Sequence, residues 1–214
     1  MTETDRKTYW DSYYGGRDVP GLPSQFAVFM LGEYNLPVAV DIGCGSGRDT
    51  FFFRAQGATS LGLDGSDAAI ASCTSKARAR GLDRLSSHTV DIADPALAGR
   101  TLDLLAAADA DSPALLYARF FVHAITDAAE DALLRLGYEI LRRRGGVLGL
   151  EYRTIRDRSL QKVTPDHYRR FVDPAVLIAK AARLGYSVDY AVEGFGMAKY
   201  RNDDAFVART VLRL

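Results

Sequence analysis

The stretch VAVDIGCGSGRDTFFF, residues 38–53, decides the fold. It begins with small and β-branched apolar residues, continues through three alternating glycines, and resumes with polar residues and three phenylalanines. This order predicts a strand over 38–42, a tight loop, and a helix from about residue 48 to residue 56. A strand, a glycine loop and a helix in succession are typical of a nucleotide site. The question is which nucleotide the loop holds, and for what chemistry.

The rest of the chain alternates between strands and helices. Further helices are predicted over about 5–14, 24–34, 66–80, 126–144 and 174–183, and further strands over about 59–64, 86–91, 114–120, 147–152, 186–193 and 205–214. This alternation predicts an α/β fold with a parallel, doubly wound sheet. The last two strands have no helix between them and are expected to form an antiparallel hairpin at the sheet edge. Since no linker rich in Pro, Gly or Ser interrupts the chain, residues 1–214 are expected to form a single domain.

Charge and cysteine content exclude several classes of protein. The 214 residues carry 27 basic and 27 acidic side chains, so no overall field attracts nucleic acid or an anionic membrane. Cys44 and Cys73 belong to no CxxC pair or metal-ligand cluster, which predicts reduced thiols and no metal site. The polar N-terminus and the lack of an apolar run of about 18–20 residues predict neither a signal peptide nor a membrane span. We therefore expect a cytoplasmic protein, and its many arginines, few lysines and abundant alanine suggest a bacterial one.

The residues around the glycine loop indicate which ligand it holds. Dinucleotide-binding loops follow G-x-G-x-x-G, but here Arg48 stands where the third glycine would be. Asp41, just before the loop, is a poor neighbour for a pyrophosphate and a good one for a cation. No Gly-Lys-Ser/Thr follows, so the loop is not a Walker loop. A ligand with a nucleoside and a cationic end but no phosphate fits better, and S-adenosylmethionine has both.

Two further acidic residues stand at predicted strand ends. Asp64 ends the second strand, 17 residues after Gly47, and Asp91 ends the third. The carboxyl ends of parallel strands form the ligand-binding edge of a doubly wound sheet. The carboxylate of Asp64 is therefore expected within reach of the two ribose hydroxyls, and Asp91 suits the exocyclic amine of adenine.

Taken together, five segments resemble the class I S-adenosylmethionine-dependent methyltransferases of the small-molecule type. They are DIGCGSGRD (41–49), GLDGSDAAI (62–70), VDIAD (90–94), LLYARFFVHAI (115–125) and LRRRGGVLGLEY (141–152). The resemblance covers about residues 35–153. It implies a Rossmann-like, doubly wound sheet of seven strands, mostly parallel with an antiparallel C-terminal strand, and S-adenosyl-L-methionine as the cofactor.

The resemblance also implies which residues hold this cofactor. The glycines of the loop contact the methionine part, Asp64 binds the ribose, and Asp91 with Ile92 binds adenine. The cofactor-binding candidates are Asp41, Gly43, Cys44, Gly45, Gly47, Asp64, Gly65, Ser66, Asp91, Ile92, Arg119 and Phe120. Three roles stay open for Arg119: binding the cofactor carboxylate, binding an anionic acceptor, or pairing with Asp91.

Similar enzymes build the acceptor site from the loops after the fourth and fifth strands. The Asn/Asp-Pro-Pro-aromatic motif of nucleic-acid and protein amide methyltransferases is missing after the fourth strand, which argues against methylation of bases or glutamine. Phe121 and His123 stand there instead. Histidine titrates near neutral pH, so His123 is our candidate catalytic base for an acceptor hydroxyl or amine. The alternative is a hydrogen-bonded structural histidine.

A basic segment, EYRTIRDRSLQKVTPDHYRRF (151–171), follows the fifth strand in an otherwise neutral chain. Arginine is suited to bidentate recognition of carboxylates and phosphates, so this segment predicts a small anionic acceptor. Its substrate-binding candidates are Arg153, His167, Arg169 and Arg170. The alternative is a solvated loop with surface ion pairs.

Aromatic residues crowd the N-terminal YWDSYY (9–14), where Tyr9/Tyr13 and Trp10/Tyr14 are i,i+4 pairs. Similar enzymes close an N-terminal helix over the site and so exclude water. We expect a helical lid over about residues 5–35, with Tyr9 and Tyr13 contacting the substrate. A helix packed permanently on the sheet is the alternative.

The sequence thus predicts a methyltransferase that modifies an oxygen or nitrogen of a small anionic metabolite, such as one in natural-product biosynthesis. Three alternatives remain. A cofactor-binding protein without catalysis has the same loop. An RNA methyltransferase is disfavoured by the zero net charge, and an NAD(P)-dependent oxidoreductase by Asp41 and Arg48. We expect no nucleic-acid or membrane partner.

Overall fold

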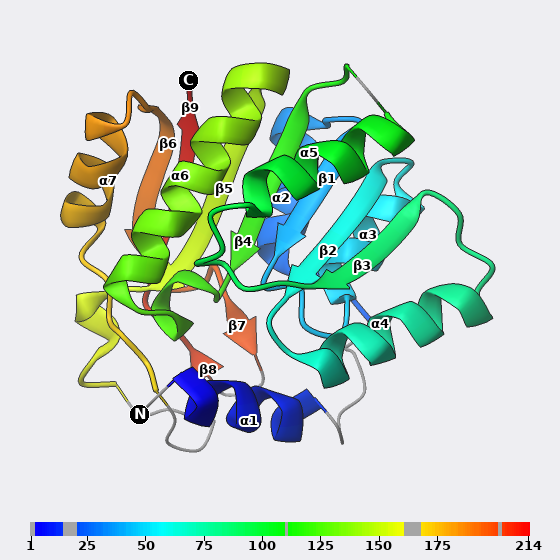
Figure 1. Cartoon of the computed structure of the whole chain (residues 1–214). Helices are drawn as coiled ribbons and strands as arrows, with labels where there is room; N and C mark the ends of the chain where they lie inside the picture. The colour runs from blue at the N-terminus through cyan, green and yellow to red at the C-terminus, as the bar shows by residue number, and fades with distance from the viewer. Residues whose placement is uncertain (1–2, 15–20, 110, 161–167, 201–202) are drawn as a thin grey trace.

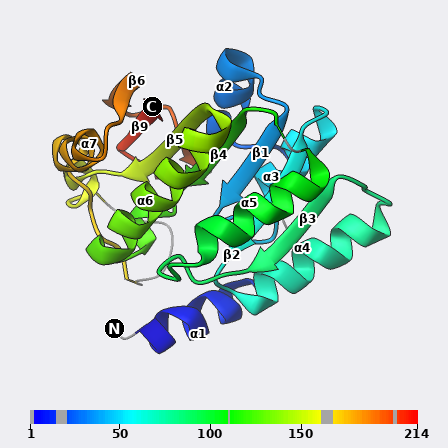
Figure 2. The same ribbon diagram turned by 45° about the horizontal axis from the view of Figure 1, so that its top comes forward.

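The computed structural model describes residues 3–14, 21–109, 111–160, 168–200 and 203–214. A seven-stranded sheet crosses the molecule, with helices on both of its faces (Figures 1 and 2). Its strands are β1 (Val38–Ile42), β2 (Thr59–Asp64), β3 (Leu85–Thr89), β4 (Ala114–Arg119), β5 (Gly146–Arg153), β6 (Ser187–Gly194) and β9 (Val207–Arg213). The α-helices are α1 (Glu3–Tyr14), α2 (Gln25–Tyr34), α3 (Arg48–Ala55), α4 (Asp67–Ala79), α5 (Leu97–Ala108), α6 (Asp127–Arg144) and α7 (Pro174–Arg183).

The strand order is β3-β2-β1-β4-β5-β9-β6. The pairs from β3 to β5 are parallel, whereas β9 runs antiparallel to both of its neighbours. This arrangement confirms the predicted α/β class, with a seven-stranded, mostly parallel sheet and an antiparallel C-terminal strand. The two closing strands also pair as predicted, and because β9 lies between β5 and β6, it is β6 that forms the sheet edge.

Each face of the sheet has its own apolar layer, because successive side chains of a strand point to opposite faces. Val38 and Val40 of β1 belong to the core shared with α5, α6 and α7. Ala39, between them, belongs to a second core that contains Phe26 and Met30 of α2. Both side chains of α2 are fully buried, so α2 is a fixed layer of the fold. The lid proposal is therefore confined to α1, which lies along the edge where the parallel strands end (Figure 1).

Capping side chains fix the helix starts that position the site. Ser24 accepts from the backbone N–H of Ala27, and Ser66 accepts from that of Ala69. The sequence predicted both caps. The same hydroxyl groups make contacts at the site described below.

Three features differ from the sequence-based expectation. The segment between Asp91 and Ala114 holds α5, a helix that was not predicted, and its N-cap Ala96 offers no side-chain hydrogen bond. Strand β3 ends at Thr89, so Asp91 lies in the loop after the strand. In the stretch of chain that connects β6 to β9, the short strands β7 (Lys199–Tyr200) and β8 (Asp203–Asp204) form a separate two-stranded sheet. Among the helices that the structure describes, none has the length and apolar character to cross a membrane.

Candidate active site

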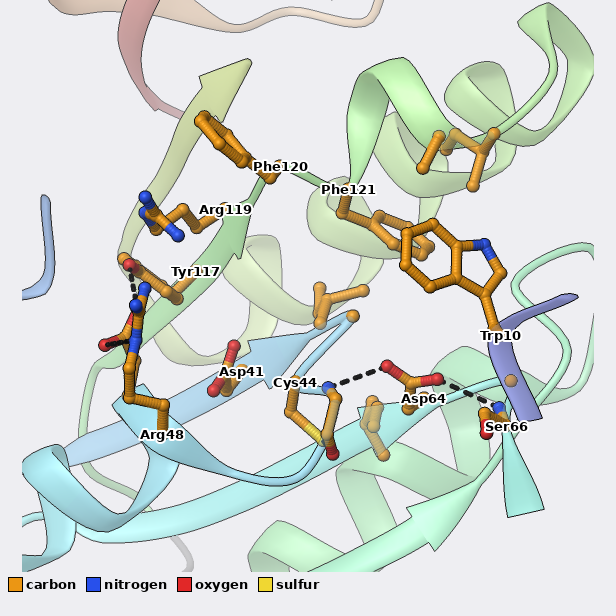
Figure 3. Close-up of a pocket in the computed structure, with 18 of the residues that line it drawn as sticks. Trp10, Asp41, Cys44, Arg48, Asp64, Ser66, Tyr117, Arg119, Phe120 and Phe121 are labelled. Carbon is orange, nitrogen blue, oxygen red and sulfur yellow. Dashed lines mark hydrogen bonds and ion pairs between the residues drawn. The ribbon is translucent and has the colours of Figure 1, made fainter. Parts of the chain in front are cut away.

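A pocket of about 800 Å³ opens at the carboxyl ends of the parallel strands. A volume of this size is typical of sites that bury a small-molecule ligand. Residues from α1, the glycine loop, the ends of β2, β4 and β5, and the β7–β8 segment line it. Figure 3 shows the wall formed by the loop and the strand ends, with Trp10 of α1 projecting toward Phe121.

The glycine loop has the backbone that only glycine adopts readily. The φ angles of Gly43, Gly45 and Gly47 are 75°, 55° and 91°. A Cβ on Gly45 would come within 2.6 Å of the Tyr14 hydroxyl, and one on Gly43 within 2.4 Å of the Phe121 ring. Gly47 does not line the pocket. It allows α3 to approach α4, since a Cβ there would come within 2.6 Å of Sγ of Cys73.

The Asp64 carboxylate joins the loop to the start of α4. Its Oδ2 accepts from the backbone N–H of Gly45 at 2.7 Å, and its Oδ1 from that of Ser66 at 2.9 Å (Figure 3). Burial raises the pKa of Asp64, although the hydrogen bonds from Ser66 and Gly45 oppose this shift. A carboxylate accepts about four hydrogen bonds, so Asp64 retains capacity to accept from a ligand hydroxyl.

Asp41 lies at the end of β1 with 3% of its surface exposed. Its Oδ2 accepts from the Thr50 hydroxyl at 2.6 Å. Burial, followed by the negative charge of Asp49, raises the pKa of Asp41 to about 7. A cation in the pocket would stabilise the ionised form of Asp41, and this is the ligand charge that the sequence indicates.

Asp91 and Ile92, which the resemblance assigns to adenine, line the pocket, although Asp91 lies beyond the end of β3. Gly65, Ser66, Asp91 and Ile92 all line the pocket. Asp91 is exposed and accepts from the backbone N–H of Ala93 at 2.8 Å. Because β3 ends at Thr89, Asp91 begins the turn after the strand, in which its backbone carbonyl accepts from the N–H of Asp94.

Asp49 forms a buried network that the sequence did not reveal. Its carboxylate accepts from the backbone and hydroxyl of Ser24, at 2.8 and 2.7 Å, and from the Tyr117 hydroxyl at 2.8 Å. Nε of Arg48 lies 3.2 Å away. Burial alone would raise the pKa of Asp49, but the charge of Arg48 and the hydrogen bonds from Ser24 lower it. The network links α2, α3 and β4 beside the pocket.

Arg119, at the end of β4, pairs with a buried carboxylate on the neighbouring strand. Its Nε donates to Oε1 of Glu151 at 2.9 Å, while Nε of Arg209 donates to Oε2 at 2.8 Å. Glu151 is fully buried. Of the three roles left open for Arg119, the structure thus gives no support to pairing with Asp91. The side chain also lines the pocket.

Phe120 has a strained backbone beneath this arginine. Its φ is 56°, a left-handed conformation that costs a non-glycine residue about 1–2 kcal/mol. The Arg119 guanidinium lies 4.3 Å from the centroid of the Phe120 ring. Such strain persists where surrounding contacts require it, and functional sites are common places for it.

His123 lies in a short 3₁₀ helix (Val122–Ala124) and is 4% exposed. Its Nδ1 accepts from the backbone N–H of Arg153 at 3.2 Å. A backbone amide can only donate, so the proton of a neutral His123 lies on Nε2. In that form Nε2 donates hydrogen bonds and cannot accept a proton. The geometry favours a positioning role over the general base predicted from the sequence.

The basic segment after β5 is arranged differently from the prediction. Arg153 and Arg169 line the pocket, whereas Arg170 does not. Arg153 pairs with Asp157 at 2.7 Å and Asp203 at 2.5 Å, so two carboxylates already face its charge. His167 lies outside the described residues.

Arg170 binds the first turn of α6. It pairs with Asp127 at 3.0 Å and with Glu130. These contacts hold the segment after β5 against α6, and they give no support to Arg170 as a substrate-binding residue.

Helix α1 presents aromatic side chains to the pocket. Trp10, Tyr13 and Tyr14 line it, whereas Tyr9, which was predicted to contact the substrate, does not. Asp11 holds α1 to the start of α4, because its Oδ1 accepts from the Ser66 hydroxyl at 2.5 Å. The i,i+4 pattern was visible in the sequence, but the face that points inward depends on this contact between helices.

Comparison with known proteins decides the family. The sequence pattern of the methyltransferase domain matches residues 39–145, half of the chain. The chain belongs to this methyltransferase family. No similar sequence is found among the curated proteins.

Solved structures of methyltransferases have the same fold. An S-adenosylmethionine-dependent methyltransferase from Anabaena variabilis is 18% identical, with a TM-score of 0.69 over 100% of this chain and 95% of that chain. The CcbJ methyltransferase of Streptomyces caelestis is 15% identical, with a TM-score of 0.71 over 98% of both chains. The glycopeptide N-methyltransferase MtfA, solved with S-adenosylhomocysteine, is 14% identical, with a TM-score of 0.67 over 92% of both chains.

S-adenosylmethionine is the cofactor of this methyltransferase, and the pocket fits it. The Tyr14 hydroxyl packs where a Cβ of Gly45 would lie, so this wall of the pocket requires glycine, and the carboxylate of Asp64 suits the ribose hydroxyls. Asp41 faces the pocket with a carboxyl group that a cationic ligand would ionise. The loop and the two acids thus have the chemistry that a nucleoside with a positively charged end requires.

Proposed function

We propose that this methyltransferase transfers a methyl group to an oxygen or nitrogen of a small anionic metabolite. Bound S-adenosylmethionine supplies a methyl group on a positively charged sulfur, and transfer to the acceptor leaves a neutral thioether. Residues around the loop and Asp64 would hold the nucleoside. Residues at the ends of β4 and β5, with the β7–β8 segment, would hold the acceptor.

One observation carries the anionic character of the acceptor. The Arg119 guanidinium lines the pocket on the side away from Asp64 and Ser66 (Figure 3). Arg169 lines the pocket too. Arginine recognises carboxylates and phosphates through paired hydrogen bonds. The names of two structural neighbours, a glycopeptide N-methyltransferase and a protein of echinomycin biosynthesis, support a natural product or its precursor as the acceptor.

The chain's own residues would contribute positioning and exclusion of water. Trp10, Tyr13 and Tyr14 cover the pocket from α1, which keeps water from the reacting atoms. His123 lines the same pocket and would help to position the acceptor. Methyl transfer is an in-line displacement, for which correct placement of the two reactants supplies much of the rate enhancement.

The test is a methylation screen with S-adenosylmethionine labelled in its methyl group. Carboxylated and phosphorylated metabolites are compared with neutral analogues of the same skeleton. We expect label to be transferred to an anionic compound and not to its neutral analogue. Transfer only to neutral compounds would contradict the anionic acceptor, and cofactor binding without transfer to any compound would contradict catalysis on small molecules.

A further inference from the structure

The Arg119 guanidinium is fixed on one side and open on the other. Its Nε is bound to Glu151, and its plane lies over the Phe120 ring. Within the described part of the chain, neither of its Nη groups has a protein partner. The side chain is 17% exposed, and this exposed part faces the pocket. The guanidinium therefore presents a preorganised pair of donors to a ligand.

Arg119 has only a shared carboxylate as its ion-pair partner. Arg119 and Arg209 both bind Glu151, whereas Arg48 pairs with Asp49. Buried charge is costly unless it is paired, and the Nη edge of Arg119 is where a ligand in the pocket can add a second partner.

Arg153, another arginine that lines the pocket, provides a contrast. Arg153 has two carboxylate partners, Asp157 and Asp203, and is 4% exposed. Its charge is already more than offset, so a further anion would gain little there. Arg119 thus shares one carboxylate with a second arginine, whereas Arg153 on the neighbouring strand has two, so a ligand anion would gain more at Arg119.

We propose that the Nη edge of Arg119 binds a carboxylate of a ligand in the pocket, and that Glu151 is the positioning residue that orients it. A planar carboxylate matches the two parallel donors of a guanidinium edge. One guanidinium edge matches a monoanion, and the negative charge of nearby Asp49 would disfavour a phosphate dianion. The carboxylate belongs either to the methionine part of the cofactor or to the acceptor, and the second case rests on the function proposed above.

The experiment uses Arg119→Gln with two cofactor products. S-adenosylhomocysteine has the amino-acid carboxylate, and 5′-methylthioadenosine has the same nucleoside and thioether without it. If the carboxylate is that of the cofactor, the variant should bind S-adenosylhomocysteine about 10- to 100-fold more weakly. Binding of 5′-methylthioadenosine should not change.

A second titration detects a carboxylate from the acceptor. Trp10 is the only tryptophan of the chain and lines the pocket, so its fluorescence reports on ligands there. Protein saturated with S-adenosylhomocysteine is titrated with benzoate and with neutral benzamide. If the acceptor supplies the carboxylate, benzoate should bind the wild-type protein more tightly than benzamide, and Arg119→Gln should remove this difference.

Controls separate binding from folding. Arg142→Gln removes an exposed arginine of α6 that pairs with Glu139, far from the pocket lining, and should change neither titration. Glu151→Gln should weaken the same affinity as Arg119→Gln, by a smaller factor. Arg119→Lys keeps the charge but loses the paired donors, so its affinity should lie between those of the wild type and Arg119→Gln. It also replaces Arg119→Gln in both titrations if that variant fails to fold.

The proposal is overturned if Arg119→Gln, folded like the wild type, changes neither the affinity for S-adenosylhomocysteine nor the preference for benzoate. A wild-type protein that does not bind S-adenosylhomocysteine at all, or that transfers no methyl group, would instead contradict the proposed function. The two failures are therefore distinguishable.

Discussion

The two ends of the pocket, one proposed above to hold the cofactor and the other the acceptor, are built in different ways. The cofactor end comes mainly from one short stretch, residues 41–66, in which a strand, the glycine loop, a helix and a second strand follow one another. The acceptor end combines α1, the ends of β4 and β5, and the β7–β8 segment, which are far apart in the sequence. In the first case local order fixes the geometry. In the second, contacts between distant segments decide which charges remain available to a ligand.

This difference explains what arginines at the acceptor end can do. In the sequence, Arg153 and Arg170 appear equivalent as anion-binding candidates, and Arg119 has three open roles. In the structure, Asp157 of the same segment and Asp203 of β8 neutralise Arg153, and two carboxylates of α6 neutralise Arg170. Arg119 shares its carboxylate with Arg209 and keeps a free edge. Whether one of these arginines can bind a ligand anion therefore depends on how many carboxylates already pair with it.

The largest effect is expected at the cofactor end, for Asp64→Ala. Two hydrogen bonds from ribose hydroxyls to a charged acceptor are lost, at about 1.5–3 kcal/mol each, and the anchor of Gly45 goes with them. The Kd for S-adenosylhomocysteine should rise at least ~100-fold, measured by calorimetry. Asp67→Ala, which removes an exposed carboxylate from the first turn of α4, is the matched control. Equal affinities for the wild type and a folded Asp64→Ala variant would show that Asp64 only holds the loop.

A smaller effect at the same end concerns pH. Because the pKa of Asp41 is about 7 in the free protein, a cationic ligand that favours its ionised form lowers this pKa and releases a proton. Affinity for S-adenosylmethionine should therefore rise about tenfold from pH 6 to pH 8 and level off above. Asp41→Asn should bind with a much weaker pH dependence. A variant with the same slope as the wild type would assign the titration to another group.

The ionisation of Asp41 as the pH rises should strengthen cofactor binding but lower the free energy of unfolding. The folded-state pKa of Asp41 lies above its ordinary value of 3.8, so the folded protein holds this proton more tightly than the unfolded chain does. The contribution of Asp41 to the free energy of unfolding is full below about pH 4 and falls as the pH rises through about 7. Urea unfolding of the wild type and Asp41→Asn at pH 5 and pH 8 should show the variant gaining relative stability at pH 8.

At the acceptor end, His123→Asn should have a modest effect. The amide oxygen of asparagine can replace Nδ1 as acceptor for the backbone N–H of Arg153, so the local fold is kept. If His123 only positions the acceptor, kcat should fall less than about tenfold, whereas loss of a general base typically costs about 10²–10⁴-fold. A loss in that larger range, together with loss of the acidic limb of the pH–rate profile, would restore the role of base.

The smallest effect on activity is expected for Arg170→Ala. Its ion pairs with Asp127 and Glu130 hold the segment before α7 to α6, so their loss should lower the free energy of unfolding by about 1–2 kcal/mol. The acceptor KM should stay within about twofold of the wild-type value. A tenfold rise in KM at unchanged stability would place Arg170 in the acceptor site.

Most of the fold could be predicted because its signals are local. Alternating apolar residues indicated the strands, and Ser24 and Ser66 marked helix starts by capping chemistry. Helix α5 was missed because Ala96 gives no capping signal and Gly99 interrupts the helical pattern. The spacing of Leu97, Thr101 and Leu105, all buried on one face, was the available clue.

The candidate site could be predicted only where the sequence fixes side chains through a continuous backbone. Asp41, Gly43 and Gly45 line the pocket because one continuous strand and loop carries them, and Asp64 lies beside them because β2 pairs in parallel with β1. The tautomer of His123, by contrast, depends on a backbone N–H of β5, which no local pattern encodes. The inward face of α1 depends likewise on the contact of Asp11 with α4.

The central claim is that the loop end of the pocket holds a nucleoside with a cationic end and no phosphate. Calorimetric titration of the wild-type protein with S-adenosylhomocysteine, NAD⁺ and NADP⁺ tests it most directly. We predict that S-adenosylhomocysteine binds with one equivalent per chain and a Kd in the micromolar range, while neither dinucleotide gives measurable heat. Tight binding of a dinucleotide, with no binding of S-adenosylhomocysteine, would contradict the account.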